Sequence, residues 1–549
     1  MKPAFRTKDQ KTILRVSWSR NLFLLLLLQS VMAIPAMAQQ FRLIVKNGDE
    51  LPGAPGDPVE YVYSERSFID GGGNVVFGAE LESGREGYWT QIGGETRLVA
   101  FLGEPAPGIA PLALSASSSS RPNLFFNANG ELSMYTPTLS DGDSDGNNNR
   151  AILYFGEDGL EIVVRSGVET ITVVDSRAGP VEWTMGSFDA FGSNGKEAVI
   201  RAGLRKPDNV SIFDLSSNNP GSGGSVWHVD PLGAEAVTYN PKELPLSPGW
   251  EMDSSGLKVA MNDVGDYVFL ANGSGPDLNG DLQPDRYSKG IYRSRGGKME
   301  VVLRESRTVA SSLKLDVDEL VMNNHGRIAF HGVMPPNNDS AIWVENADGR
   351  SFRRVAKVGD IALQGGGVAF SEFHGFHLSD EGLLTVWAVT SDGRDGVWME
   401  SKQGITYALW KVVMEGDDAP DDNGTPAVFS KLWQAIPNNS GQLLFSASRE
   451  EKGDGSYIGR SFWIGSFHPI FDEPVFERVF GESDRVEVAQ DLMPSVSYHT
   501  DISFSLDPFQ NNSHLIGSGT PFNDDGQVLV GFSGNQFSPV YTQVRSLGW

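Results

Sequence analysis

Two short stretches of the sequence carry oxygen-bearing side chains at alternate positions, a pattern that suits a hard metal ion. In PDLNGDLQPDR these residues are Asp277, Asn279, Asp281, Gln283 and Asp285. In SDGDSDGNNNR they are Asp141, Asp143, Asp145, Asn147 and Asn149. A loop that bends at a glycine can surround Ca²⁺ with six or more such oxygens. The sequence therefore predicts two candidate calcium sites, with a solvated acidic loop as the alternative at each.

The first of these stretches resembles the calcium loops of dockerin modules and of integrin-type propellers. It departs from them because Gly280 precedes Asp281 instead of following it. A third acidic stretch, EGDDAPDDNG at 415–424, contains Pro420 and lacks clean alternation. We expect this third stretch to form a turn between structural units.

Histidine chemistry has little support in the sequence. His374 and His377 are close in FHGFHL, but residues three apart on a strand point to opposite faces, so one exposed and one packed imidazole is expected. His325 and His331 have no carboxylate partner that the sequence reveals. No GxSxG, HExxH or phosphate-loop pattern occurs.

The elements that would position any site come from a repeated octet, typified by NNHGRIAF at 323–330. Asn, Asp or Ser begins a tight turn, a glycine takes positive φ, and an alternating strand follows. The octet glycines are Gly73, Gly130, Gly195, Gly265, Gly326, Gly382, Gly441 and Gly526. The last octet residue is predicted to fill the core, as at Phe77, Phe269, Phe330 and Phe445.

Two further elements follow most octets. One is a small residue, an apolar residue and a large aromatic, ending for example at Trp89, Trp343, Trp398 and Trp463, with a looser form at Tyr154. Its fixed place in the repeat predicts packing between units. The other is an apolar strand that ends near a glycine and an acid, as in FRRVAKVGD.

The repeat is out of phase at its ends. The eighth octet lacks the apolar strand, while a matching strand occurs at 41–48, before the first octet. A closed ring needs this arrangement, because a blade built from both chain ends leaves no open sheet edge. We predict an all-β, eight-bladed propeller of about four strands per blade over 39–549, with an irregular or inserted segment near 464–515. The alternative is an open β-solenoid or two β domains.

The octets resemble those of the choice-of-anchor tandem repeat NxxGxxAF-containing family, secreted bacterial repeat proteins of unknown function. Only NNHGRIAF matches the complete motif; the other copies keep the glycine and an apolar residue four positions later. The resemblance implies export and a repeat scaffold, and it implies no activity.

The N-terminal sequence also predicts export. Six basic residues precede the apolar run NLFLLLLLQSVMAIP, and Ala36-Met37-Ala38 forms a small-x-small cleavage site. We expect a signal peptide at 1–38 and a secreted, periplasmic or cell-surface protein; a retained membrane anchor is the alternative. Removal of this segment would change the net charge from −26 to −31, which disfavours nucleic acid as a partner. The chain has no cysteine, so packing and bound ions must provide its stability.

The function favoured by the sequence is non-catalytic. Its repeated parts are structural and its loops vary, so we expect an exported propeller that presents loops to a protein or polysaccharide, with calcium as a stabilising ion. The catalytic residues of any enzyme on this scaffold are unknown from sequence. A propeller-fold glycan hydrolase or lyase and a purely structural envelope protein remain the alternatives.

Overall fold

The computed structural model describes most of residues 40–481, together with 527–531 and 540–544. Gaps in the first range fall at 116–121, 127–129, 137–138, 141–149, 169, 176–178, 206–222, 240–244, 248–250, 276–285, 309–314, 334–339, 404–405, 421–425 and 469–472. Residues 41–549 form one compact unit. Every element in the described part of the chain is a β-strand, and no helix there is long and apolar enough to cross a membrane.

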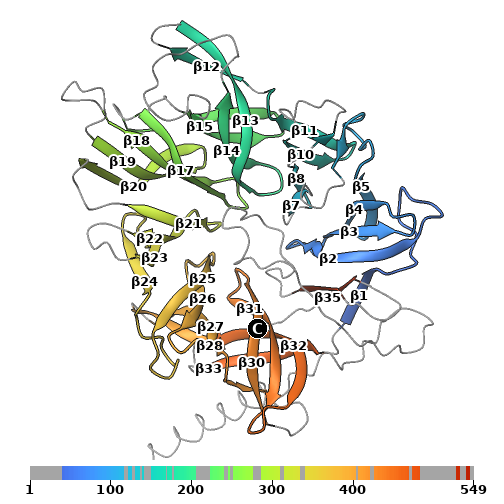
Figure 1. The fold of residues 1–549 in the computed structure, drawn as a ribbon, viewed down its shortest axis with the longest axis vertical. Helices are drawn as coiled ribbons and strands as arrows, with labels where there is room; N and C mark the ends of the chain where they lie inside the picture. The colour runs from blue at the N-terminus through green and yellow to red at the C-terminus, as the bar shows by residue number, and fades with distance from the viewer. Residues whose placement is uncertain are drawn as a thin grey trace, which may run out of the picture. The chain divides into compact units, whose positions relative to one another are not determined.

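The strands form a β-propeller arrangement of seven blades, coloured in chain order in Figure 1. Each blade is an antiparallel sheet whose strands follow chain order. Blade 1 contains β2 (Val59–Ile69), β3 (Val75–Leu81), β4 (Glu86–Ile92) and β5 (Glu95–Phe101), and blade 2 contains β7 (Asn123–Phe126), β8 (Leu132–Thr136), β10 (Ala151–Gly156) and β11 (Gly159–Arg165). Blade 3 contains β12 (Thr170–Asp175), β13 (Gly179–Ser193), β14 (Ala198–Arg205), β15 (Gly223–Asp230) and β16 (Gly233–Tyr239). Blade 4 contains β17 (Glu251–Met261), β18 (Tyr267–Ser274), β19 (Arg286–Arg295) and β20 (Lys298–Thr308).

Blades 5 to 7 follow the same plan. Blade 5 contains β21 (Asp316–Met322), β22 (Ile328–Val333), β23 (Ser340–Glu345) and β24 (Phe352–Lys357). Blade 6 contains β25 (Phe370–Leu378), β26 (Leu384–Thr390), β27 (Asp395–Gln403) and β28 (Thr406–Met414). Blade 7 contains β29 (Asp418–Ala419), β30 (Ala427–Pro437), β31 (Gln442–Glu451), β32 (Tyr457–His468) and β33 (Glu473–Gly481). A small extra sheet pairs β6 (Ala113–Leu114) with β9 (Leu139–Ser140).

The blade count differs from the predicted eight. In place of an eighth four-stranded blade there is a three-stranded sheet of β1 (Gln40–Val45), β35 (Val540–Val544) and β34 (Val528–Gly531). An octet marks one turn per repeat, so counting octets does not establish that four strands assemble around each one. Within the predicted irregular segment near 464–515, the described residues are the end of β32, to His468, and β33 (Glu473–Gly481); residues 482–515 lie outside the described part.

The octets form a turn, referred to below as the octet turn, between the first two strands of each four-stranded blade and between the second and third strands of the five-stranded blades 3 and 7. The octet glycines within the described residues all have positive φ, between 72° at Gly326 and 89° at Gly195; Gly526 lies outside those residues. In the typical turn, the backbone N–H of Gly326 donates to the carbonyl of Asn323 at 2.9 Å. The glycine supplies a backbone conformation that an L side chain would strain.

The leading asparagine of an octet turn also connects blades. The Oδ1 of Asn323 accepts the N–H groups of His325 (3.1 Å) and Arg327 (2.9 Å) in its own turn. Its Nδ2 donates to the carbonyl of Ser379 in the next octet turn at 2.7 Å. Likewise, the Nδ2 of Asn262 donates to the carbonyl of Asn323 at 2.9 Å. Both amides are buried, so each satisfies polar groups that water does not reach.

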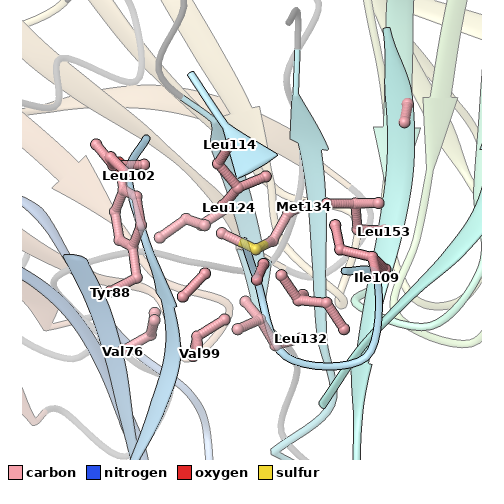
Figure 2. Close-up of a cluster of buried hydrophobic side chains, with 14 of the residues drawn as sticks. Val76, Tyr88, Val99, Leu102, Ile109, Leu114, Leu124, Leu132, Met134 and Leu153 are labelled. Carbon is pink, nitrogen blue, oxygen red and sulfur yellow. The ribbon is translucent and has the colours of Figure 1, made fainter. Parts of the chain in front are cut away.

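Apolar clusters fill the spaces between consecutive blades. Figure 2 shows one such cluster, where Val76, Tyr88 and Val99 of blade 1 face Leu124, Leu132 and Met134 of blade 2. Equivalent clusters join every consecutive pair from blades 2 and 3 to blades 6 and 7. Because strand side chains alternate, each blade contributes one face to each neighbouring cluster.

The repeated aromatic residue lies directly opposite the last octet residue. Phe77 pairs with Trp89, Phe330 with Trp343 and Phe445 with Trp463. The indole N–H of Trp89 donates to the carbonyl of Pro52 at 3.0 Å, and that of Trp398 to the carbonyl of Leu363 at 3.3 Å. In blade 2 Leu153, and not Tyr154, occupies this position opposite Met134.

The small residue before the aromatic has a steric role. A Cβ at Gly396 would lie 2.6 Å from Cη2 of Trp398, and one at Gly87 would lie 2.8 Å from Cη2 of Trp89. The indole therefore covers the strand glycine two positions earlier, and a larger residue at the glycine position would displace the indole.

We predict that Gly396→Ala lowers the free energy of unfolding by about 1–3 kcal/mol, because the new methyl group overpacks the Trp398 site. Gly156→Ala is the matched control in another strand, since its Cβ would lie 3.6 Å from Cε1 of Tyr154, an ordinary contact. Urea unfolding followed by tryptophan fluorescence measures both. Equal stability of the two variants would contradict the proposed role of the glycine.

Candidate functional site

The two predicted calcium stretches both lie outside the described residues, so the positions of their side chains are not described. Their flanking strands show where the loops attach. The 141–149 stretch follows β9 and precedes β10, and the 277–285 stretch follows β18 and precedes β19. In the sequence, both stretches thus lie between the second and third strands of a blade.

The acidic stretch at 415–424 connects two blades where it is described. The N–H of Gly416 donates to the carbonyl of Phe429 in blade 7 at 2.7 Å, and Asp417 Oδ2 accepts the N–H of Met414 at 2.8 Å. Residues 421–425 are outside the described part. The described residues thus leave β28 and form β29, the short first strand of blade 7.

A β-bulge recurs in the strand before the octet turn in blades 5, 6 and 7, always five residues before the octet begins. The bulged residues are Asp318, His374 and Trp433. A bulge leaves its residue outside the regular pairing and redirects the side chain. We use the term bulge layer for three positions of a blade. They are the bulged residue, the residue five positions after the octet glycine, and the residue three positions before the repeated aromatic.

The bulge layer of blade 5 is a polar row of Asp318, His331 and Ser340. His331 Nδ1 lies 3.5 Å from Asp318 Oδ2, and its Nε2 lies 3.3 Å from Ser340 Oγ. The sequence reveals no carboxylate partner for His331, and the structure provides one in Asp318. Twelve residues and a turn lie between the two, and only strand pairing brings them together.

In blade 6 the same three positions hold His374, Trp387 and Asp395. His374 Nε2 lies 3.0 Å from Asp395 Oδ1, and its ring meets the Trp387 ring edge-on, with centroids 5.1 Å apart. His377, the other histidine of this strand, is half-buried, and desolvation lowers its pKa to about 4. The spacing predicted one exposed and one packed imidazole, but both residues are half-buried, because a bulge at His374 interrupts the regular alternation of the strand.

In blade 7 the positions hold Trp433, Ser446 and Arg460. Trp433 is 42% exposed, whereas most third-strand aromatics are fully buried. Sequence analysis missed it because it lies in the least regular strand of the repeat. Its offset from the octet, shared with Asp318 and His374, is the signal that could have revealed it.

Glu319 adds a titratable group beside the blade 5 row. It pairs in register with His331, and burial raises its pKa from 4.5 to about 7, with Lys258 of β17 opposing this shift and Asp318 adding to it. Burial also lowers the pKa of His331 and of Lys258. Glu319 and His331 thus place a carboxyl group and an imidazole at paired positions of adjacent strands, and these are the two kinds of group that carry out most acid–base chemistry in proteins.

Metal binding has no support in this layer. Within the part of the chain that the structure describes, no three His, Asp or Glu side chains are arranged to hold an ion. The bulge layer is therefore a set of varied polar and aromatic side chains at equivalent positions of three consecutive blades.

A comparison with known protein families identifies one family, and that family has no assigned function. The profile of a family of unknown function, DUF7453, matches three overlapping stretches, residues 30–223, 145–364 and 315–533. Repeated matching of one profile along the chain is what an internal repeat produces. No curated protein matches the sequence.

Three solved structures are distantly similar. A polysaccharide lyase of family PL25, an ulvan lyase bound to -[GlcA(1-4)Rha3S]-, has 10% identity over 92% of this chain and 98% of its own, with a TM-score of 0.30. Sqt1 of Saccharomyces cerevisiae has 9% identity over 91% and 99%, with a TM-score of 0.32. The fucose-binding lectin of Aleuria aurantia has 12% identity over 64% and 96%, with a TM-score of 0.24.

We predict that Glu319 makes stability fall as pH rises. Its raised pKa means that the folded state binds this proton more tightly, so the free energy of unfolding declines by about 2 kcal/mol as pH rises from 4.5 to 7. Glu319→Gln should flatten this decline, and Glu381→Gln, at an exposed carboxylate, should not. Urea unfolding across this pH range measures it; parallel curves for wild type and Glu319→Gln would contradict the assignment.

Proposed function

The chain belongs to the family of unknown function DUF7453, and from this premise we propose that it is an exported, non-catalytic β-propeller that binds a polysaccharide or protein. The observation that carries the proposal is the bulge layer. Three blades with the same strand order and the same octet turn hold entirely different side chains at the same three positions. A scaffold that is constant while one layer varies is typical of repeat proteins that recognise extended ligands.

The proposal includes a closed ring in which the three-stranded sheet is an eighth blade. Its order β34, β35, β1 matches the order of second, third and outer strands in the other blades. Val45 of β1 packs in the apolar cluster of blade 1 with Phe77 and Trp89. An N-terminal strand that completes the last blade would fasten the two chain ends together.

We also propose that the protein is exported, on the basis of its basic and apolar N-terminus. We propose kinship with the choice-of-anchor repeat proteins on the basis of the octets. Both agree with the strongly acidic composition and the absence of cysteine. An envelope or extracellular setting would bring the chain into contact with polysaccharides.

Calcium binding by the 277–285 and 141–149 loops is part of the proposal. We predict that Ca²⁺ at a hundredfold excess over Kd stabilises the mature chain by about 2.7 kcal/mol for each loop that binds an ion. Asp277→Asn with Asp281→Asn should reduce this gain, while Asp348→Asn, in an exposed turn, should not. Calorimetry and melting with and without a chelator measure it. A melting temperature that chelation leaves unchanged would rule out a stabilising ion.

The binding function predicts saturable association without chemical change. Residues 39–549 would be tested against neutral and acidic polysaccharides and against cell-envelope protein extracts, with the ligand recovered and sized afterwards. We expect binding to at least one polysaccharide or defined protein, and a ligand of unaltered length. The absence of binding throughout, or shortening of the ligand, would overturn the proposal.

A second candidate, a glycan hydrolase or lyase, is favoured by Glu319, His331 and Lys258. These groups converge from blades 4 and 5, and proton transfer by a carboxylic acid or imidazole is central to cleavage of glycosidic bonds. New reducing ends or unsaturated products formed by the wild type and abolished in Glu319→Gln would favour this candidate.

A further inference from the structure

The exposed tryptophan of blade 7 is surrounded by cations. Lys431 Nζ lies 4.0 Å from the Trp433 ring centroid, and Arg460 Cζ lies 5.0 Å from it. Lys431 and Trp433 are two residues apart on β30, while Arg460 lies on β32. Two positive charges held against one exposed aromatic ring form a compact cationic and apolar surface.

Hydrogen bonds fix the positions of these side chains. The indole N–H of Trp433 donates to Ser448 Oγ at 3.0 Å, and Arg460 Nη2 donates to Ser446 Oγ at 3.3 Å. Both serines are buried on β31. Strand register places Lys431 opposite Ser448, and Ser448 opposite Arg460. The cluster is thus mounted across three adjacent strands and would lose little conformational freedom when it binds a ligand.

Glu415, a carboxylate whose charge interacts with Lys431, is engaged by the backbone. Glu415 Oε1 accepts the N–H of Leu432 at 3.1 Å, and its Oε2 accepts the N–H of Asp395 at 3.2 Å. Burial raises the pKa of Glu415, and Lys431 opposes that shift. Lys431 forms no ion pair with any residue in the described ranges, so its ammonium group can take a ligand oxygen.

We propose that Trp433, Lys431 and Arg460 form a binding site for an acidic saccharide, one that bears carboxylate or sulfate groups within a polysaccharide. The anionic oxygens would accept hydrogen bonds from Lys431 Nζ and the Arg460 guanidinium, and the C–H groups of the sugar would lie against the exposed part of the indole. In a chain of net charge −26, such a local cationic site selects anionic groups that the rest of the surface repels. This inference rests on the proposed binding function and specifies its ligand class.

The test compares polygalacturonate and chondroitin sulfate with neutral dextran, using affinity electrophoresis and tryptophan fluorescence at low and high salt. We expect binding to an acidic polymer that weakens with salt and falls at least about tenfold in Trp433→Ala and Arg460→Gln. Lys431→Gln should weaken it less, and Trp433→Phe should retain part of it, since the ring is kept.

Matched controls in the same blade separate a site from a general effect. Tyr457→Ala removes another exposed aromatic ring, and Lys452→Gln removes another exposed cation; both should leave binding unchanged. Unchanged melting temperatures would show that the variants fold. Binding to acidic polymers that survives Trp433→Ala and Arg460→Gln, or binding only to dextran, would overturn this site while the general binding function stands. If the chain binds no polysaccharide, this site is overturned. If it also binds no protein, the general binding function is overturned as well.

Discussion

The hydrogen bonding of the octet asparagines Asn262 and Asn323 is the constraint that joins blades 4, 5 and 6. A tight turn exposes backbone N–H groups, and packing it against the next blade removes those groups from water. The side chain of Asn323 solves both problems, because its oxygen satisfies its own turn and its nitrogen satisfies the next one. An unsatisfied buried polar group costs about 1–3 kcal/mol, so the octet turn is stable only where the neighbouring blade is correctly placed.

The rest of each blade follows from that placement. With the octet turn fixed, Phe330 and Trp343 lie opposite each other on one face, and the alternate residues fill the cluster on the other face. Two buried ion pairs reinforce the same contacts: Arg293 reaches Glu345 at 2.6 Å, and Arg353 reaches Glu400 at 2.6 Å. Each glutamate also accepts a backbone N–H of the octet strand in its own blade. A buried charge without its partner is costly, so these pairs favour one arrangement of adjacent blades.

Variation is permitted where neither the turn nor the apolar clusters impose a residue type. The bulge layer is such a place, because its first member has left the regular pairing. Asp318, His374 and Trp433 have nothing in common chemically, yet they share one position relative to the octet. Recognition or catalysis can therefore diversify there without disturbing the scaffold, which is how function commonly attaches to a repeated fold.

The sequence alone determined the all-β propeller class, the octet turns and the aromatic core positions, because turn chemistry and strand alternation are local properties. It overcounted the full blades, since one octet does not guarantee four strands. Only the tertiary structure decided which polar residues meet. Asp318 and His331 join across a hairpin, Glu319 and Lys258 come from different blades, and Trp433 and Arg460 lie two strands apart. Strand register and a one-residue bulge set these contacts, and neither leaves a local signal in the sequence.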